Sequence, residues 1–192
     1  MSKSIQIVQT EILSNQWYVL RKITYQHSKN DGTLQTQSRE VYDRGNGAAI
    51  LLYHLPTKNV ILTRQFRLPT YVNGNADGMM IEVCAGLLDE DHPDDCIKKE
   101  TLEETGYLIS DVTKVMEAYM SPGAVTEIIH FYVAAYTPEM KIGVGGGLEQ
   151  EGEDIEVMEI HLDEAMKMVE TGVIKDAKTI LLLQYVALHV LK

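Results

Sequence analysis

The segment 99–107, KETLEETGY, carries three glutamates within five residues. Glu100 and Glu104 lie one turn apart on the same face of a helix, and Glu103 lies beside them. Because neighbouring carboxylates repel one another, they require either full solvation or a cation, and hard divalent ions such as Mg²⁺ prefer oxygen ligands. The pattern therefore indicates a metal site that binds phosphate groups. The alternative is a solvated helix face on which the two preceding lysines pair with the glutamates.

The residues around these glutamates predict a helix with defined ends. Asp91, His92 and Pro93 are typical of a helix cap and first turn, and Gly106 is typical of a C-terminal stop. Gly86 precedes the helix in the sequence. We therefore expect a loop, a helix and a second loop of fixed length, with the acids in the last turns of the helix.

This arrangement resembles the sequence box of the Nudix hydrolase superfamily. The box runs Gly, five residues, Glu, seven residues, then Arg-Glu-apolar-x-Glu-Glu-x-Gly-apolar. Five of its fixed positions match this chain, namely Gly86, Glu100, Glu103, Glu104 and Gly106. Because five fixed positions over about 21 residues rarely coincide by chance, the resemblance is specific.

Four features depart from the family pattern. The family's first Glu falls at His92, its Arg at Lys99 and its apolar position at Thr101, and the spacer is one residue short. In the family, the first Glu and the Arg mainly brace the loop against the helix. The departures therefore concern that brace more than the chemistry, and the metal-binding half of the box is intact.

The rest of the chain is similar to one branch of the superfamily, which acts on ADP-ribose and nucleoside-diphosphate sugars. Pro122 in MSPGAVTE, sixteen residues after Gly106, is a feature of that branch. The segments REVYDRGNGAAILLY, RQFR, YVNGN, CAGLLD, MSPG, VTEIIHF and KTILLL are similar to members that hydrolyse GDP-mannose to GMP and mannose 1-phosphate. The resemblance implies Mg²⁺-dependent hydrolysis of the pyrophosphate bond of a nucleoside-diphosphate sugar. ADP-ribose hydrolysis and a non-catalytic Nudix-like protein that binds nucleotide sugars are the alternatives.

Hydrolysis of a pyrophosphate needs charge neutralisation on its oxygens, an oriented water molecule and a base. The metal ligands that the resemblance implies are Glu100 and Glu104 with Glu103 beside them, the main-chain carbonyl of Ala85, and an acid from a later loop, Glu153. Mg²⁺ is the expected ion, and Mn²⁺ is an alternative activator.

The catalytic base is expected among three acids beyond the box. In relatives this acid lies just before the IEV strand, which favours Glu153, with Glu151 as the second choice. Glu127 in the SPGAVTE segment is the third. Three glycines precede the acidic run 149–154, so its backbone is expected to move over bound substrate. The alternative is a solvated acidic loop.

Arginine and aromatic side chains are expected to recognise the phosphates and the base. The resemblance favours Arg67 as a phosphate contact, whereas Arg64, expected on the opposite face of the same strand, pairs structurally. Trp17 either stacks on the nucleotide base or lies in the core, and Lys178 is either a substrate contact or a surface lysine. The full substrate-binding set that the resemblance implies is Trp17, Ser38, Arg39, Glu40, Arg67, Ala85, Gly86, Leu87, Glu104, Glu127, Glu153 and Lys178.

Composition sets the outer limits of these functions. The net charge of −11 argues against nucleic-acid and anionic-membrane partners, because both require clustered Lys and Arg. Cys84 and Cys96 have no CxxC spacing, so we interpret both as reduced packing residues. Because the sequence shows neither a signal-peptide pattern nor a long apolar segment, we expect a cytoplasmic protein.

The hydrophobic pattern predicts strands and a few helices. Asp31-Gly32 between alternating runs is a hairpin signal within the first 45 residues. Strands are expected at 5–13, 17–27, 33–42, 48–55, 59–68, 79–86, 112–119, 127–136 and 155–161, and helices at 162–170 and 176–191. This favours an α+β fold, the α/β/α sandwich of the Nudix family, with an additional N-terminal antiparallel β-subdomain. The expected domains are 1–45 and 46–192.

The N-terminal strands also bear on oligomeric state. Three strands bury too little surface to be stable alone, so they must pack on the rest of the chain or on another subunit. In the nucleoside-diphosphate-sugar branch, this segment exchanges between subunits and helps to build the partner's site. We therefore expect a homodimer with a site shared between subunits, and the alternative is a self-contained subdomain in a monomer.

Overall fold

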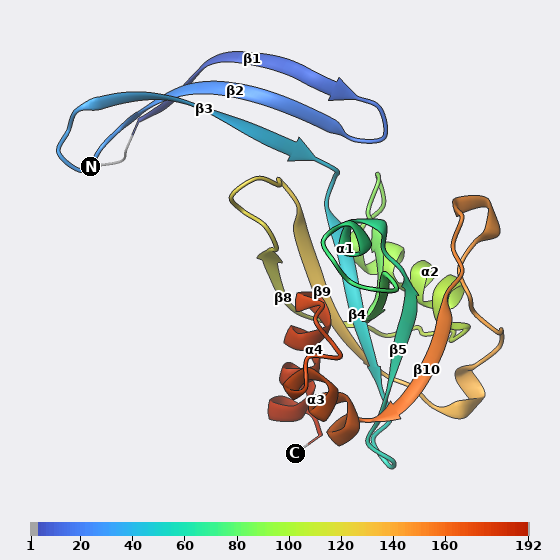
Figure 1. The fold of residues 1–192 in the computed structure, drawn as a ribbon. Coiled ribbons are helices and arrows are strands. Elements are labelled where there is room, and N and C mark those ends of the chain that lie inside the picture. The colour runs from blue at the N-terminus through green and yellow to red at the C-terminus, as the bar shows by residue number, and fades with distance from the viewer. Residues whose placement is uncertain (1–3, 192) are drawn as a thin grey trace. The chain divides into compact units, whose positions relative to one another are not determined.

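The computed structural model describes residues 4–191, and for Glu151 it describes the backbone alone. The chain divides into two compact units. Unit 1 holds the residues up to Asn46 together with Tyr119–Ile128, and unit 2 holds Gly47–Ala118 and the residues from Ile129 onward. Figure 1 shows the elements of both units along the chain.

Unit 1 contains a three-stranded antiparallel sheet in the order β1-β2-β3. The strands are β1 (Ile5–Asn15), β2 (Val19–Ser28) and β3 (Leu34–Asp43). The hairpin turn before β3 uses Gly32 at φ 84°, and the Asp31 carboxylate accepts the Thr33 N–H at 2.9 Å. The N-terminal antiparallel β-subdomain expected from the sequence is therefore confirmed.

The two faces of this sheet differ in polarity. The register places Ile5, Ile7 and Ile12 of β1 opposite alternate residues of β2, on the same face as Ile23. These three isoleucines are 70%, 62% and 60% exposed. The other face carries polar side chains such as those of Gln6, Glu11, Lys22, Thr24, Ser38 and Glu40. One face of the sheet thus exposes the isoleucines of β1 to solvent, and it also carries Arg21 and Arg39.

Unit 2 is built on a mixed sheet whose main strand order is β10-β5-β4-β9-β8. Its strands are β4 (Gly47–Tyr53), β5 (Asn59–Phe66), β8 (Thr113–Tyr119), β9 (Ile128–Ala135) and β10 (Glu156–His161). β4 and β9 are parallel, whereas β5 is antiparallel to β4 and β10. Two short strands, β6 (Met79–Glu82) and β7 (Cys84–Leu87), pair with β5 and β4. The central strand β4 is buried on both faces, so it reads as a continuous apolar run.

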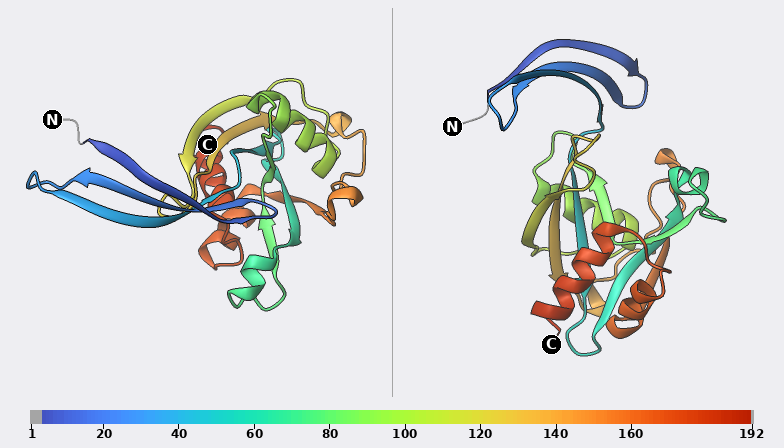
Figure 2. Two further views of the ribbon diagram at one scale, coloured as in Figure 1. Left: turned by 90° about the horizontal axis from the view of Figure 1, so that it is seen from above. Right: turned by 60° about the vertical axis from the view of Figure 1, so that its left-hand side comes forward.

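Helices cover both faces of the unit 2 sheet, as Figure 1 and Figure 2 show. On one face α2 (Pro93–Thr105) packs on β4 and β7, over a core that includes Ile50, Ile97 and Tyr132. On the other face lie α3 (Leu162–Glu170) and α4 (Ala177–His189). Two 3₁₀ turns, Pro138–Met140 and Glu149–Glu151, complete the elements. The predicted α/β/α sandwich is confirmed.

The structure differs from the expected elements around Arg67. β5 ends at Phe66, and the short helix α1 (Leu68–Val72), which the sequence pattern did not predict, follows it. Arg67 is the residue before α1, so its expected place within the strand, on the face opposite Arg64, is wrong. The change of direction follows from Pro69, which fits the first turn of a helix but would remove a strand hydrogen bond.

The expected strand 79–86 is interrupted at Val83. Its N–H donates to the Thr179 hydroxyl at 2.8 Å, and this bond ties the sheet to the first turn of α4. The break separates β6, which carries Glu82, from β7, which carries Ala85 and Gly86. None of the described helices has the length and apolar character needed to cross a membrane.

Candidate functional site

The ends of α2 match the sequence prediction. His92 caps the N-terminus, and its Nδ1 accepts the Asp94 N–H at 3.4 Å. Gly106 ends the helix in the left-handed region at φ 78°, and its N–H donates to the Leu102 carbonyl. Asp94 also accepts a hydrogen bond from the Tyr132 hydroxyl at 2.6 Å, which fastens the helix to β9. His92, at the position of the family's first Glu, therefore serves as a helix cap.

Glu104 is buried rather than solvated, with 2% of its surface exposed. Its Oε2 is inaccessible to solvent and has no hydrogen-bond partner among the described residues. Burial raises the pKa of this carboxyl to about 8, a hydrogen bond with Cys84 opposes the rise, and the charges of Glu100 and Glu153 add to it. The nearby charge of Arg67 lowers the pKa. The alternative of a fully solvated acidic face is therefore wrong at Glu104.

Gly86 makes room for the carboxylate of Glu100. A Cβ atom at Gly86 would collide with the carboxylate of Glu100. Gly86 and Ala85 belong to β7, which pairs with β4 through Ala49 and Ala85, so the backbone beside α2 is held by the sheet. The box glycine therefore allows β7 and the α2 acids to approach closely.

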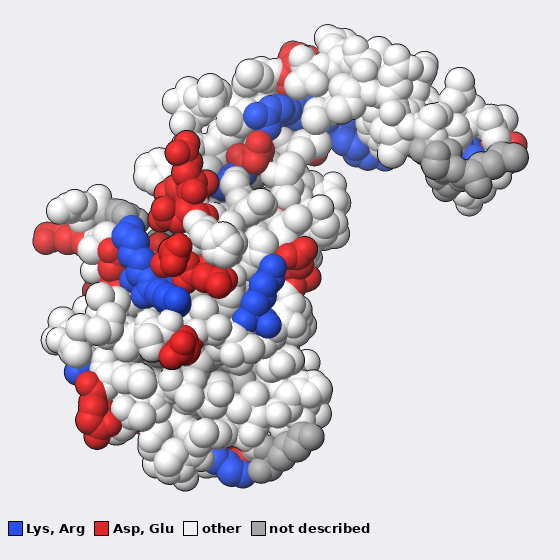
Figure 3. Space-filling view, turned by 180° about the vertical axis from the view of Figure 1, so that it is seen from behind, with Lys and Arg blue, Asp and Glu red and all other residues white. Residues whose placement is uncertain are grey.

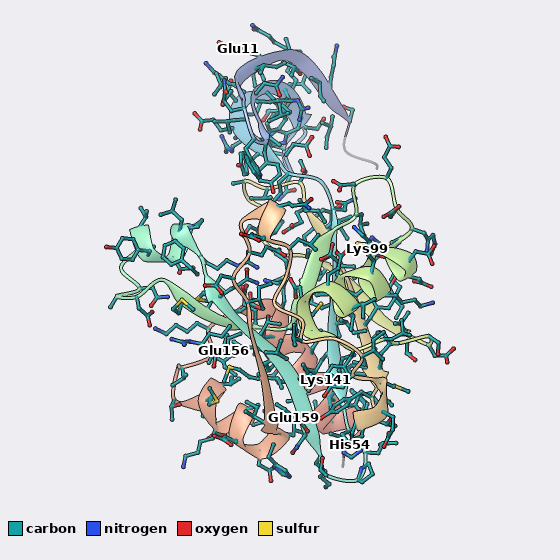
Figure 4. All side chains as sticks on the ribbon, turned by 90° about the vertical axis from the view of Figure 1, so that its right-hand side faces the viewer. Glu11, His54, Lys99, Lys141, Glu156 and Glu159 are labelled. Atoms are coloured by element: carbon teal, nitrogen blue, oxygen red, sulfur yellow. The ribbon has the colours of Figure 1, made fainter. Side chains whose placement is uncertain are left out.

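Glu103 has different surroundings from its two neighbours. Its carboxylate lies 3.7 Å from the Lys99 ammonium, one turn earlier on the helix, and its side chain is 24% exposed. Figure 4 shows Lys99 on α2. Lys99 stands where the family has Arg, and it pairs along its own helix. Among the three box glutamates, Glu104 is the one whose burial demands a cation most strongly.

The three glycines 145–147, which we call the glycine strap, pack on the end of α2. The Gly146 and Gly147 N–H groups donate to the Glu104 and Glu103 carbonyls at 2.9 and 3.1 Å. All three glycines have positive φ, of 71°, 111° and 79°. A Cβ at Gly145 would collide with the Glu104 carbonyl. The glycines are thus required by close backbone approach, a reason that the sequence interpretation of a moving loop did not include.

The strap also positions Glu153. The Leu148 N–H donates to Glu153 Oε2 at 3.0 Å, and a Cβ at Gly147 would collide with the same carboxylate. The charge of Glu153 acts on the pKa of Glu104, so the loop acid lies near the box. Glu153 and Glu100 therefore both lie within electrostatic range of Glu104. The side chain of Glu151 lies outside the described residues.

The two predicted cationic contacts meet at a residue that the sequence reasoning missed. Arg67 Nε donates to Glu82 Oε2 at 2.7 Å, and Lys178 Nζ donates to Glu82 Oε1 at 3.3 Å. Lys178 also donates to Asp176 at 2.7 Å. Burial lowers the pKa of Lys178, but Asp176 and Glu82 outweigh it, so the net shift is upward. One sequence feature could have identified Glu82: it is an acid within the apolar segment MMIEVCAG, where an unpaired charge would be costly.

Five predicted substrate-binding residues belong to unit 1, and four of them lie in or beside its three-stranded sheet. Trp17 precedes β2 and is 85% exposed, so the core alternative is wrong. The Arg39 guanidinium donates to the Ser38 carbonyl at 2.9 Å, and the Ser38 hydroxyl lies 2.8 Å from that of Thr24. Glu40 is exposed and stands opposite Lys22 in the register.

Glu127 also lies in unit 1 and is 9% exposed. Its Oε1 lies 3.4 Å from Nε of Arg44, whose guanidinium stacks over the Tyr18 ring at 5.5 Å from the centroid. An arginine therefore already balances the charge of Glu127, in contrast to that of Glu104. This difference favours the box acids and Glu153 as the metal-binding group.

The donor set in unit 2 fits a hard divalent cation. Glu104 supplies a buried carboxylate oxygen that lacks a hydrogen-bond partner within the described chain, and Gly86 leaves space for Glu100 beside it. Within residues 4–191, no three acid, His or Cys side chains lie close enough together to hold a metal ion by themselves. The acids would therefore supply only some of the ligands of a bound ion. Main-chain carbonyls or substrate oxygens would supply the others, as is usual for Mg²⁺ with phosphate substrates.

Charged side chains on the face of unit 2 are mixed in sign. In Figure 3, acidic and basic side chains lie next to one another across the middle of this unit. This face therefore shows no broad basic field. Binding would depend on particular cations such as Arg67 rather than on a broad basic field.

We expect Glu104→Gln to stabilise the metal-free protein at alkaline pH. Because the folded pKa is raised above the ordinary value of 4.5, the unfolded chain loses its proton first, and stability falls as pH rises from about 4.5 to about 8. Gln carries no such cost. Melting temperatures in a chelator should differ little at pH 5, and the variant should melt roughly 5 °C higher at pH 8.5.

Glu103→Gln is the matched control for this measurement. Its side chain is less buried and pairs with Lys99, so its melting temperature should follow the wild type at both pH values. Added Mg²⁺ should raise the melting temperature of the wild type at pH 8.5 but not that of Glu104→Gln. A difference between Glu104→Gln and wild type that does not change with pH would contradict the raised pKa.

Comparisons with known proteins match both units. A family model described as the NUDIX domain matches residues 43–183, and one described as the GDP-mannose pyrophosphatase NudK N-terminal domain matches residues 4–42. The chain is 53% identical over 189 residues to a GDP-mannose pyrophosphatase of Cronobacter sakazakii, covering 98% of each chain. It is 52% identical over 185 residues to a GDP-mannose pyrophosphatase of Salmonella typhimurium, covering 96% of each. The box, the sandwich fold and these matches agree, and the chain belongs to the Nudix hydrolase family.

Proposed function

We propose that this protein hydrolyses the pyrophosphate bond of GDP-mannose, releasing GMP and mannose 1-phosphate. The observation that carries the proposal is the match, at 52–53% identity over 96–98% of the chain, to proteins named GDP-mannose pyrophosphatase. The match includes the N-terminal β-subdomain as well as the Nudix domain. The domain division at residues 1–45 and 46–192 is part of the proposal.

Nudix hydrolases use divalent metals, and we propose Mg²⁺ here, with Mn²⁺ as an alternative. The proposed ligands are Glu100, Glu104, Glu153 and the main-chain carbonyl of Ala85, with Glu103 more peripheral because it pairs with Lys99. A bound divalent ion would supply charge neutralisation for the phosphate oxygens and acidify a water molecule. The buried, partnerless Oε2 of Glu104 supports this assignment.

The residues of the chain then orient the reactants. We propose Glu153 as the base that accepts the proton of the attacking water, because Leu148 N–H holds one of its oxygens and leaves the other available for that proton. Glu151 and Glu127 remain the second and third candidates. Arg67 and Lys178 are proposed to bind the phosphates, close to the main chain at Ala85, Gly86 and Leu87. Trp17 is proposed to stack on the base, with Ser38, Arg39 and Glu40 beside it.

We also propose a homodimer with a shared site. The exposed isoleucines on one face of the β1-β2-β3 sheet support it, because exposed apolar patches mark interaction surfaces. The proposed compartment is the cytoplasm, which the two free thiols of Cys84 and Cys96 support.

Turnover of a panel of nucleotide sugars tests the substrate. With Mg²⁺ present, GDP-mannose should give the highest kcat/KM, with GMP and mannose 1-phosphate as products, while ADP-ribose, GDP-glucose and UDP-glucose should be slower. Equal or faster turnover of ADP-ribose would favour the ADP-ribose pyrophosphatase alternative. Binding of GDP-mannose without turnover would favour a non-catalytic protein.

Gly86→Ala should reduce Mg²⁺-dependent turnover as Glu100→Gln does. The added methyl group takes the space of the Glu100 carboxylate, a flexible group that can move aside, so the fold should persist while the ligand is displaced. We expect kcat to fall at least about 100-fold in both variants, with melting temperatures within a few degrees of wild type.

Gly143→Ala is the matched control for this substitution. Its Cβ would meet backbone atoms no nearer than 3.6 Å, and its φ is not positive. Its turnover should equal that of the wild type. Unchanged turnover in Gly86→Ala and Glu100→Gln would refute the proposed ligand role.

The mass in solution tests the dimer. Light scattering at micromolar concentration should give twice the chain mass of 21.6 kDa. Replacing Ile5, Ile7 and Ile12 together with Ser should shift the mass toward the monomer, because it removes apolar surface from the exposed face. A monomeric wild type would refute the shared site.

A further inference from the structure

Glu82 is a buried carboxylate whose two oxygens contact two different cations. It is 5% exposed at the end of β6. Oε2 accepts from Arg67 Nε at 2.7 Å and Oε1 accepts from Lys178 Nζ at 3.3 Å. Removing a carboxylate from water is costly, so its retention at a strand position calls for a reason beyond packing.

The three residues come from three separate elements. Glu82 is on β6, Arg67 immediately precedes α1, and Lys178 is in the first turn of α4. Among the described residues, Glu82 is the one group that contacts both cations. Arg and Lys side chains are long and flexible, and they lose rotamer freedom when they bind a ligand. A single carboxylate that holds both in the free protein removes much of that cost in advance.

Exposure shows which side of this network faces solvent. The side chain of Glu82 is 6% exposed and that of Lys178 18%, whereas that of Arg67 is 41% exposed. A guanidinium has five N–H donors, and Glu82 takes the Nε donor, so the terminal nitrogens remain for a bidentate contact with phosphate. Arg67 also interacts electrostatically with Glu104, so its guanidinium lies within electrostatic range of this box acid.

The charges in the network cancel. Arg67 and Lys178 are balanced by Glu82 and Asp176, which contacts Lys178 at 2.7 Å. The network therefore adds no net positive charge, and its contribution to anion binding depends on the directions of its donors rather than on net charge. This distinguishes geometric positioning from simple electrostatic attraction.

We propose that Glu82 is a positioning residue for substrate binding, which fixes Arg67 and Lys178 at a set spacing so that both contact the diphosphate group of the substrate. The inference rests on the proposed hydrolysis of a nucleotide sugar, and it deepens that proposal by naming the group that arranges the phosphate contacts. Glu82 itself touches neither substrate nor metal. Its effect passes through the two cations.

Two variants separate geometry from charge. Glu82→Gln keeps the length of the side chain and removes the charge, whereas Glu82→Asp keeps the charge and shortens the reach, so it cannot contact both cations. Both should raise KM for GDP-mannose by about tenfold or more and leave kcat within about threefold of wild type. A role in charge balance alone would let Glu82→Asp behave as the wild type, which would overturn the proposal.

Glu156→Gln is the matched control. Glu156 on β10, labelled in Figure 4, forms an exposed ion pair with Arg64 at 3.2 Å. Arg64 lies on β5 and is not part of the Glu82 network. This variant should retain the wild-type KM and kcat. A purely structural role for Glu82 predicts a lower melting temperature with unchanged KM, and that result would also overturn the proposal.

A binding measurement keeps this inference distinct from the proposed function. Calorimetric titration with GDP should show affinity at least about tenfold weaker in Glu82→Gln and Glu82→Asp than in wild type. In the Glu82→Gln background, Arg67→Ala should weaken GDP binding less than it does in wild type, because the two residues act as one unit. If the wild type hydrolyses no nucleotide sugar, the proposed function fails, and the GDP affinities alone decide the role of Glu82. Equal affinities would refute it.

Discussion

The burial of Glu104 is the constraint on which the site in unit 2 depends. A carboxylate with an inaccessible, partnerless oxygen destabilises the metal-free protein when it is charged, and its raised pKa of about 8 expresses that cost. The elements around it are arranged so that acidic oxygens approach this point. Gly86 lets β7 come close to Glu100, and the glycine strap bonds to the last carbonyls of α2 while it holds Glu153. Burying the charge of Glu104 lowers the stability of the metal-free protein, as is common at functional sites.

Positive charge in unit 2 is supplied at particular points rather than as a field. The chain carries 28 acidic residues against 17 Lys and Arg, so an anionic substrate gains little from the overall charge. Arg67 and Lys178 are each held by buried carboxylates, which keeps two flexible cations in place without leaving unpaired charges in the sheet. Opposite charges therefore have two proposed roles: the box acids bind a cation, and the Glu82 network positions two cations for an anion.

Unit 1 follows different physical rules. None of the residues in its three strands is fully buried, and the exposed isoleucines of β1 share one face with polar residues such as Arg21 and Arg39. Such a sheet has no core of its own, so a surface that covered its apolar side chains would stabilise it. Trp17 belongs to this unit and has 85% of its surface exposed. The ion pair between Glu127 and its arginine also lies in this unit. The proposed specificity residues thus lie mainly on a surface, whereas the proposed metal ligands lie in a packed layer.

Short-range patterns in the sequence were enough to predict the cap and stop of α2 and the Asp31-Gly32 hairpin, because backbone preferences and hydrophobic period are local properties. The three-layer fold followed from the family resemblance of the sequence box. The closeness of Glu100 and Glu104 follows from helix geometry alone. Tertiary structure decided which glutamate is buried, because exposure depends on what packs on each face of α2. It also decided that β5 ends before Arg67, that the glycine strap serves close packing, and that Glu82 joins Arg67 to Lys178. The contact between Glu82 and Lys178 joins residues 96 positions apart in the chain, and a separation in sequence does not reveal which distant residues the folded chain brings into contact.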